Sequence, residues 1–206
     1  YIQGGQIWKA TVRGLSGDNP KLVKRTQLSK VPNGIGEFKL SPDEKSLMYI
    51  SYVKSDVKTA KDSDPKLDKA DAYVTEDLMY RHWDHWVTEL PHTFVAKLGS
   101  EITPDNSIDI LANEEKLYEL PTEPHGGLEQ LDWTPDGKHI AYSCKKKTGK
   151  EYAFSTNTEI YIYNVADGTC TVIPMGGGYD TNPVWSPDGK KIVWLSMARD
   201  GYEADK

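Results

Sequence analysis

Two sets of segments along the chain have the apolar pattern of β-strands. In the first set, apolar and polar positions alternate and an aromatic residue follows an apolar one two positions later, as in Leu47 and Tyr49, Ile140 and Tyr142, and Ile192 and Trp194. The second set, 6–12, 92–98 and 159–165, is rich in β-branched and aromatic residues. Both patterns are typical of strands. The chain is therefore predicted to be all-β.

The same turn precedes each alternating segment. Its copies are residues 40–45, 133–138 and 185–190, and they share the order Ser or Thr, Pro, Asp, then Gly or Glu, then Lys. Proline presets φ, aspartate accepts hydrogen bonds from the backbone ahead, and glycine accepts a positive φ, so each copy predicts a β-hairpin. Glu44 replaces the glycine in the first copy. We expect a different turn type there, because a left-handed non-glycine residue costs ~1 kcal/mol.

The spacing of the copies indicates a repeated supersecondary unit. Thr134 and Ser186 lie 52 residues apart, and a unit of about 40–50 residues with four short strands is typical of a β-propeller blade. We predict a partial β-propeller of four-stranded antiparallel blades, as in Tol-type and peptidase-type repeats. The chain divides into a half blade (1–30), a blade with an insertion (34–120), a blade (127–175) and a half blade (180–206). So short an arc leads us to expect a longer native protein.

The insertion, near 53–91, is expected to be short and partly helical. Thr75 can cap a helix whose apolar stripe contains Met79, Trp83, Trp86 and Leu90, although these residues could also continue a strand. The insertion is then either a flap that packs its tryptophans on the rim or the wall of a substrate cavity. In the second case, Arg81 and Asp84 would bind charged ends of a ligand. A metal site at His82, His85 and His92 lacks a carboxylate at helical spacing.

Composition excludes several classes of protein. The chain has 206 residues, a net charge of −6 and 37% apolar residues, which argues against disorder and against non-specific nucleic-acid binding. No segment reaches the ~20 apolar residues of a membrane span. We expect no metal or other cofactor. Cys144 and Cys170 fall on the second and fourth strands of one blade, about 9–10 Å apart, so we expect both thiols to be free.

Several segments resemble a known family. Residues 185–194 resemble the repeat of Tol-type and peptidase-type propellers, and 76–86 and 195–206 are similar to bacterial members of the prolyl oligopeptidase family, in the group of dipeptidyl and acylaminoacyl peptidases. The resemblance extends from about Phe38 to Lys206. It implies a propeller followed by an α/β-hydrolase domain with Ser, Asp and His, and a periplasmic or secreted location. It also implies that acidic residues of an inserted segment hold the substrate's free N-terminus; the candidates for substrate binding are Arg81, Asp84 and Glu203.

The leading hypothesis is a substrate-gating propeller segment of a serine aminopeptidase that acts on short peptides. Its hydrolase domain would lie outside this chain, which itself carries no catalytic residue. The alternative is a Tol-like protein-binding propeller without catalytic activity, and a third hypothesis is a polysaccharide lyase or hydrolase with its site in the central channel. The full reading frame would separate the first two. Unpaired strand edges also predict self-association, which light scattering can measure.

Overall fold

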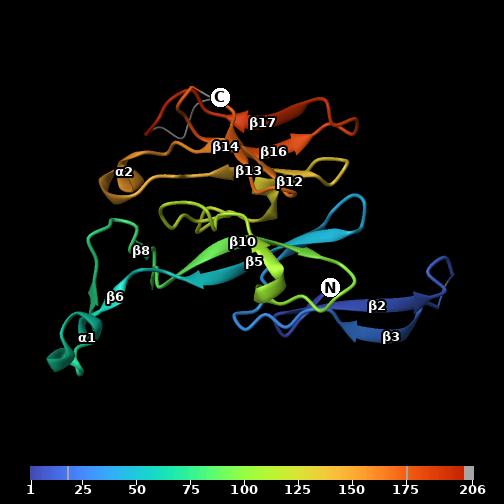
Figure 1. The fold of residues 1–206 in the computed structure, drawn as a ribbon, viewed down its shortest axis with the longest axis horizontal. Helices are drawn as coiled ribbons and strands as arrows, with labels where there is room; N and C mark the ends of the chain where they lie inside the picture. The colour runs from blue at the N-terminus through green and yellow to red at the C-terminus, as the bar shows by residue number, and fades with distance from the viewer. Residues whose placement is uncertain (18, 175, 202–206) are drawn as a thin grey trace.

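The computed structural model describes residues 1–17, 19–174 and 176–201, and these residues form a series of antiparallel sheets (Figure 1). The first sheet contains β1 (Ile2–Gln3), β2 (Gln6–Arg13) and β3 (Lys21–Gln27). The second contains β4 (Phe38–Leu40), β5 (Ser46–Lys54), β10 (Glu89–Lys97) and β11 (Ser107–Asp109). The third contains β12 (Leu131–Trp133), β13 (His139–Cys144), β14 (Glu159–Asn164) and β15 (Cys170–Val172), and the last β16 (Asp180–Trp185) and β17 (Ile192–Ser196).

Both four-stranded sheets keep the order of the sequence, so that each strand pairs with the next strand of the same sheet; β6 to β9, between β5 and β10, form two separate hairpins. In Figure 1 the sheets follow one another from the blue β2 and β3 to the red β17. Repeated four-stranded meanders of this kind are blades, and the chain is a partial β-propeller, as predicted. The exact division of the chain into blades stays a prediction.

The three repeated turns have the same geometry. The hydroxyl of Ser41, Thr134 or Ser186 donates to the aspartate two residues later, at 2.7, 2.7 and 2.6 Å. These bonds hold the pKa of each aspartate below its usual range. Glu44 takes a φ of 57°, close to the 68° of Gly137 and Gly189. The expectation of a different first turn is therefore wrong, because the same side-chain bonds offset the cost of a left-handed glutamate.

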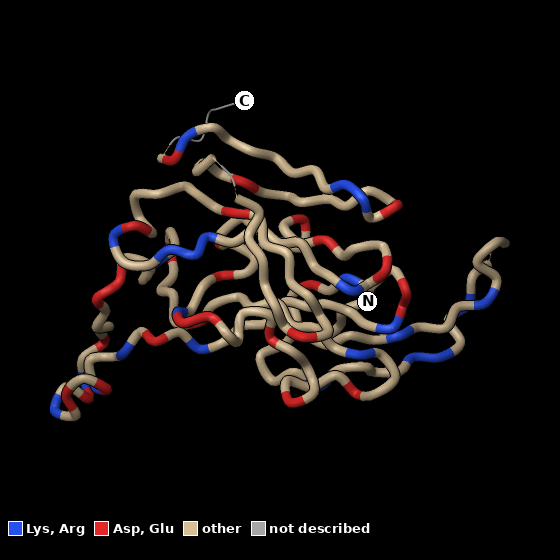
Figure 2. Tube along the Cα trace, turned by 45° about the horizontal axis from the view of Figure 1, so that its top comes forward, with Lys and Arg blue, Asp and Glu red and all other residues tan. Residues whose placement is uncertain are grey.

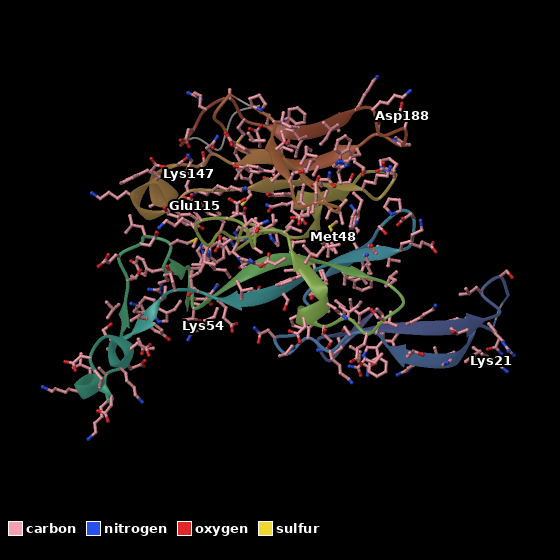
Figure 3. The ribbon with its side chains drawn as sticks, viewed as in Figure 1. Lys21, Met48, Lys54, Glu115, Lys147 and Asp188 are labelled. Atoms are coloured by element: carbon pink, nitrogen blue, oxygen red, sulfur yellow. The ribbon has the colours of Figure 1, made fainter. Side chains whose placement is uncertain are left out.

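Two apolar cores lie between the sheets. Successive residues of β5 point to opposite faces: Leu47 and Tyr49 pack with Ile7 of β2, whereas Met48 packs with Ile140 of β13. Figure 3 places Met48 between the two four-stranded sheets. Because β5 is buried on both faces, its sequence reads as a continuous apolar run rather than as a strict alternation.

Asp132 of β12 connects three neighbouring sheets. One carboxylate oxygen lies 2.6 Å from Lys39 Nζ of β4, and the other accepts from the backbone N–H of Trp185 in β16 at 2.9 Å. The Asp132 side chain is only 18% exposed, so the ion pair is partly shielded from water. This residue therefore ties β4, β12 and β16 together.

The insertion between β5 and β10 does not contain the helix expected near 75–90. It forms β6 (Lys58–Thr59), α1 (Ala60–Ser63), the 3₁₀ helix η1 (Pro65–Leu67), β7 (Tyr73–Val74), β8 (Arg81–His82) and β9 (His85–Trp86). The expected apolar stripe is not buried as a unit: Leu90 is 1% exposed, but Trp83 is 76% exposed in the β8–β9 turn. Trp86 packs instead on Tyr73, with ring centroids 5.1 Å apart, and Leu90 pairs with Val53 as part of β10. Aromatic contacts across short strands replace helical packing.

The remaining short helices are η2 (Pro104–Asn106), η3 (Leu128–Gln130) and α2 (Gly149–Phe154). No helix among the described residues has the length and apolar character needed to cross a membrane. Cys144 on β13 is buried and Cys170 on β15 is exposed, with β14 between these strands. Both thiols are free, and Cys170 Sγ lies 3.2 Å from the Tyr142 hydroxyl.

Candidate functional site

Three glutamates from two segments of the chain line one cavity beside the insertion. The cavity has a volume of about 360 Å³, and its walls are formed by Tyr52, His82, His85, Trp86, Thr88, Glu89, Glu119 and Glu123. Tyr52 belongs to β5 and Glu89 begins β10, whereas His82 and His85 come from the β8–β9 hairpin. Glu119 and Glu123 lie in the loop between β11 and η3. The insertion therefore closes a cavity whose acids come from the blade.

The loop that carries Glu119 and Glu123 is held firmly against β10. Leu120 is fully buried; its N–H donates to the Pro91 carbonyl at 2.8 Å, and its own carbonyl accepts from the Thr93 hydroxyl at 3.1 Å. Pro121 and Pro124 further restrict the backbone of the loop, because each fixes its own φ. Both carboxylates are thus presented from a backbone with little freedom, as a binding site requires.

Glu119 is the buried centre of the site. One carboxylate oxygen lies 2.5 Å from His82 Nε2, and the other accepts from the Tyr152 hydroxyl of α2 at 2.9 Å. The Glu119 side chain is only 3% exposed and that of His82 only 10%. The hydrogen bond to Glu119 raises the pKa of His82, and burial and the same carboxylate raise that of Tyr152. Glu119 therefore joins the insertion to α2 of the next blade.

Glu123 is the more accessible acid. It accepts from the Tyr52 hydroxyl at 2.8 Å through one oxygen, and its other oxygen has no hydrogen-bond partner in the described part of the chain. Burial, this bond and the charges of all three glutamates raise the pKa of Tyr52 to about 12. Glu89 is exposed and pairs in register with Lys54 of β5. The cavity is thus lined by three carboxylates, and one Glu123 oxygen has no hydrogen-bond partner among the described residues.

A second, larger cavity shares this edge. It has a volume of about 510 Å³ and is lined by Glu123 and Tyr152 together with residues of β16, among them Thr181 and Asn182. Trp83 at the tip of the β8–β9 hairpin contacts His125 of its wall, with ring centroids 5.0 Å apart. Glu123 thus stands between two hollows, one beside the insertion and one facing the last sheet.

The predicted site residues lie around the acidic cavity rather than in it. The Arg81 guanidinium lies 5.7 Å from the ring centroid of Trp86, and the Asp84 side chain is 92% exposed in the hairpin turn. Their roles stay predictions, and Glu203 lies outside the described residues. Sequence reasoning missed Glu89, Glu119 and Glu123. The available signal was the segment Glu119-Leu120-Pro121-Thr122-Glu123-Pro124, in which two prolines restrict a loop with two acids.

The pair of His82 and Glu119 predicts a pH dependence of stability. Because the folded-state pKa of His82 is raised, its contribution is fully present below the unfolded value of about 6.5 and is lost as pH rises through the folded value. The free energy of unfolding should therefore fall as the pH rises above about 6.5. Urea denaturation across this range should show a smaller fall in His82→Gln. An equal fall in both proteins would contradict the prediction.

The chain has close relatives in sequence. It is 46% identical to "Dipeptidyl-peptidase 5" of Porphyromonas endodontalis over 187 residues, which cover 90% of this chain and 26% of that protein. The protein of the same name from Porphyromonas gingivalis is 47% identical over 173 residues, covering 84% of this chain and 25% of that protein. The chain thus spans about a quarter of the length of these relatives. No family model matches the chain.

Among solved structures, the tricorn protease aligns with a TM-score of 0.47 and 9% identity, covering 92% of this chain and 14% of that one. TolB from Acinetobacter baumannii aligns with a TM-score of 0.36 and 16% identity, covering 87% of this chain and 41% of that one. The sequence matches are the stronger finding, because nearly half of the aligned residues are identical. The predicted resemblance to a peptidase propeller is confirmed, and the chain is a homologue of dipeptidyl-peptidase 5 over about a quarter of that protein's length.

Proposed function

We propose that this chain is the substrate-gating propeller segment of a serine aminopeptidase of the dipeptidyl or acylaminoacyl peptidase type. The enzyme would act on short peptides in the periplasm or outside the cell, and an α/β-hydrolase domain outside this chain would supply Ser, Asp and His. Two observations support the proposal: the relatives named dipeptidyl-peptidase 5 extend well beyond the matched region, and the sheets present a hollow, acidic edge.

The observation that carries the proposal is the cavity lined by Glu89, Glu119 and Glu123. A peptide with a free N-terminus ends in an ammonium group with three donors, and hydrogen bonds between ions are the strong ones. Glu119 is already occupied by His82 and Tyr152, so Glu123, with its free oxygen, is the proposed acceptor. Glu119 would then hold the walls in place, and Glu89 would add to the field at the entrance.

Arg81, Asp84 and Glu203 are proposed to contact charged groups of the substrate outside the cavity. Arg81 and Asp84 lie on the β8–β9 hairpin at its rim, where a peptide chain leaving the cavity would pass. Glu203 is proposed from the family resemblance alone. In this arrangement the hairpin limits the size of the peptide, because a folded protein could not bring its terminus past Trp83.

Calorimetry with a dipeptide amide and its N-acetylated form tests this function. The free amine is expected to bind and the acetylated form to bind at least about tenfold more weakly, since a hydrogen bond between charged groups contributes roughly 1.5–3 kcal/mol. Glu123→Gln should reduce binding of the free amine by a similar factor. Glu76→Gln, which removes an exposed acid of the insertion, is the matched control and should bind like the parent chain. Equal binding of both peptides would refute the proposal.

The alternative, a Tol-like protein-binding propeller without catalytic activity, is favoured by one surface. Val184, Val193 and Leu195 on β16 and β17 are 52%, 64% and 62% exposed, and they lie on the same face of this two-stranded sheet. Exposed apolar patches often mark protein interfaces. Under this alternative the free and the acetylated dipeptide amides would bind equally weakly.

A further inference from the structure

The ribbon formed by β2 and β3 extends away from the remaining sheets, and Figure 3 places Lys21 at its outer end (Figures 1 and 3). The register pairs Lys9 with Thr26, Thr11 with Lys24 and Arg13 with Lys21. A bulge at Thr11 and Val12 leaves Val23 of β3 without a partner, so Lys21 and Lys24, although three positions apart, stand opposite Arg13 and Thr11. Because alternate residues of β2 point to one face, the six paired side chains lie on that face, which we call the basic face. The opposite face carries Trp8, Ala10, Val12, Leu22, Arg25 and Gln27.

The basic face is unusual in a protein with this charge. Residues 6–27 contain five Lys or Arg and one Asp, a net charge of +4, although the whole chain carries −6. Figure 2 shows the blue positions following one another along the ribbon. The side chains of Lys9, Arg13, Lys21 and Lys24 are exposed, and within the described residues none of them forms an ion pair with Asp or Glu.

The nearest acids do not neutralise this face. Glu44 and Glu101 line the groove that Lys9 enters at the base of the ribbon, but Glu101 is paired with Lys30 at 3.0 Å. Farther out, Arg13 stands directly opposite Lys21, and like charges at such a pair destabilise a sheet. The repulsion would be relieved by an anionic ligand that lies along the ribbon.

We propose that the basic face binds an extended acidic peptide segment of a partner protein. Along β2, the cations at Lys9 and Arg13 are separated by Thr11, with alternate residues about 6.6–6.8 Å apart. Acidic side chains at alternate positions of an extended peptide have the same spacing, so their carboxylates can meet the cations, and the threonine hydroxyls can donate to carboxylates between them.

The charge distribution favours a short acidic peptide over a long polyanion. Outside the ribbon the chain carries a net charge of −10, which follows from −6 overall and +4 on residues 6–27. A nucleic acid that continued beyond the ribbon would be repelled by that surface, and the basic face holds no aromatic residue on which bases could stack. A peptide of a few residues contacts the ribbon alone.

Fluorescence anisotropy with a labelled peptide of alternating Glu and Thr tests the proposal. We expect binding at low salt that weakens as NaCl rises from about 0.05 to about 0.5 M, because added salt screens exposed charges. A peptide with Gln in place of Glu should not bind. The double variant Lys21→Glu, Lys24→Glu should bind at least about tenfold more weakly. Lys66→Glu, Lys69→Glu makes the same change of charge in the insertion and should bind like the parent chain.

Several outcomes would overturn the proposal. They are no binding of the Glu peptide, an equal loss in the two double variants, and tighter binding of single-stranded DNA or of anionic lipid vesicles with the same number of charges. Self-association of the chain that is lost in Lys21→Glu, Lys24→Glu would instead assign the face to a second copy. Far-UV circular dichroism checks folding, and Lys21→Gln, Lys24→Gln, which removes charge without reversing it, should give an intermediate loss.

Discussion

Replacing Trp133 with alanine is expected to lower the free energy of unfolding by about 3–5 kcal/mol. Trp133 of β12 is 3% exposed and packs in the core shared by both four-stranded sheets. Alanine would leave a large cavity between the sheets, and the surrounding strands are too constrained by their hydrogen bonds to close it. Urea denaturation followed by circular dichroism measures the loss.

Phenylalanine at the same position is the matched control. The Trp133 Nε1–H is buried and has no hydrogen-bond acceptor among the described residues. Phenylalanine therefore removes an unpaired donor and breaks no hydrogen bond. Trp133→Phe should therefore retain more than half of the stability that Trp133→Ala loses. If both variants lowered the free energy of unfolding equally, Trp133 would not stabilise the protein by filling space in the core.

The second large effect is expected for Glu119→Leu, with a loss of roughly 3 kcal/mol in the free energy of unfolding. The substitution removes the acceptor of both His82 and Tyr152, and it leaves two partly buried polar groups without this partner. Glu115→Leu, in the same loop but exposed, is the control and should change stability by less than about 0.5 kcal/mol. Chemical denaturation at neutral pH compares the two, and a similar loss in both would contradict the assigned role.

Glu119→Leu should also change the titration of His82. Since the hydrogen bond to Glu119 is the main cause of the raised pKa of His82, its removal should lower that pKa, and the remaining burial of the ring acts in the same direction. NMR titration of the His82 ring resolves this change separately from stability. An unchanged pKa would show that another group holds the proton on His82.

The repeated turn was the most informative feature of the sequence. In all three copies the Ser or Thr hydroxyl and the Lys backbone N–H donate to the same Asp oxygen, because the whole motif is local and its residues lie within five positions of one another. Two of the strands that follow, β5 and β13, were also predictable, since their apolar and aromatic residues pack in the two cores. The turn at Glu44 was predicted wrongly because conformational propensity includes the free-energy cost of a left-handed residue but not the hydrogen bonds around it.

The fold of the insertion and the grouping of acids in one cavity were not predicted from the sequence. The spacing of Trp83 and Trp86 suited a helix, but the two residues lie in the β8–β9 hairpin, where Trp83 is 76% exposed and Trp86 packs on Tyr73. His82 and Glu119 lie 37 residues apart, and Tyr52 and Glu123 lie 71 apart. No periodicity connects residues so distant, so the pattern could not reveal that their side chains share one cavity.

The sequence by itself determined the all-β class, the hairpin turns, the order of strands within each sheet and the family resemblance, because all of these depend on local patterns that recur along the chain. Only the tertiary structure decided which acids face one cavity, how the insertion folds, and that the cations of β2 and β3 lie together on one face. Those features depend on how the insertion and the loop after β11 pack against the blade and on the register of β2 against β3. A local sequence pattern does not specify contacts of these kinds.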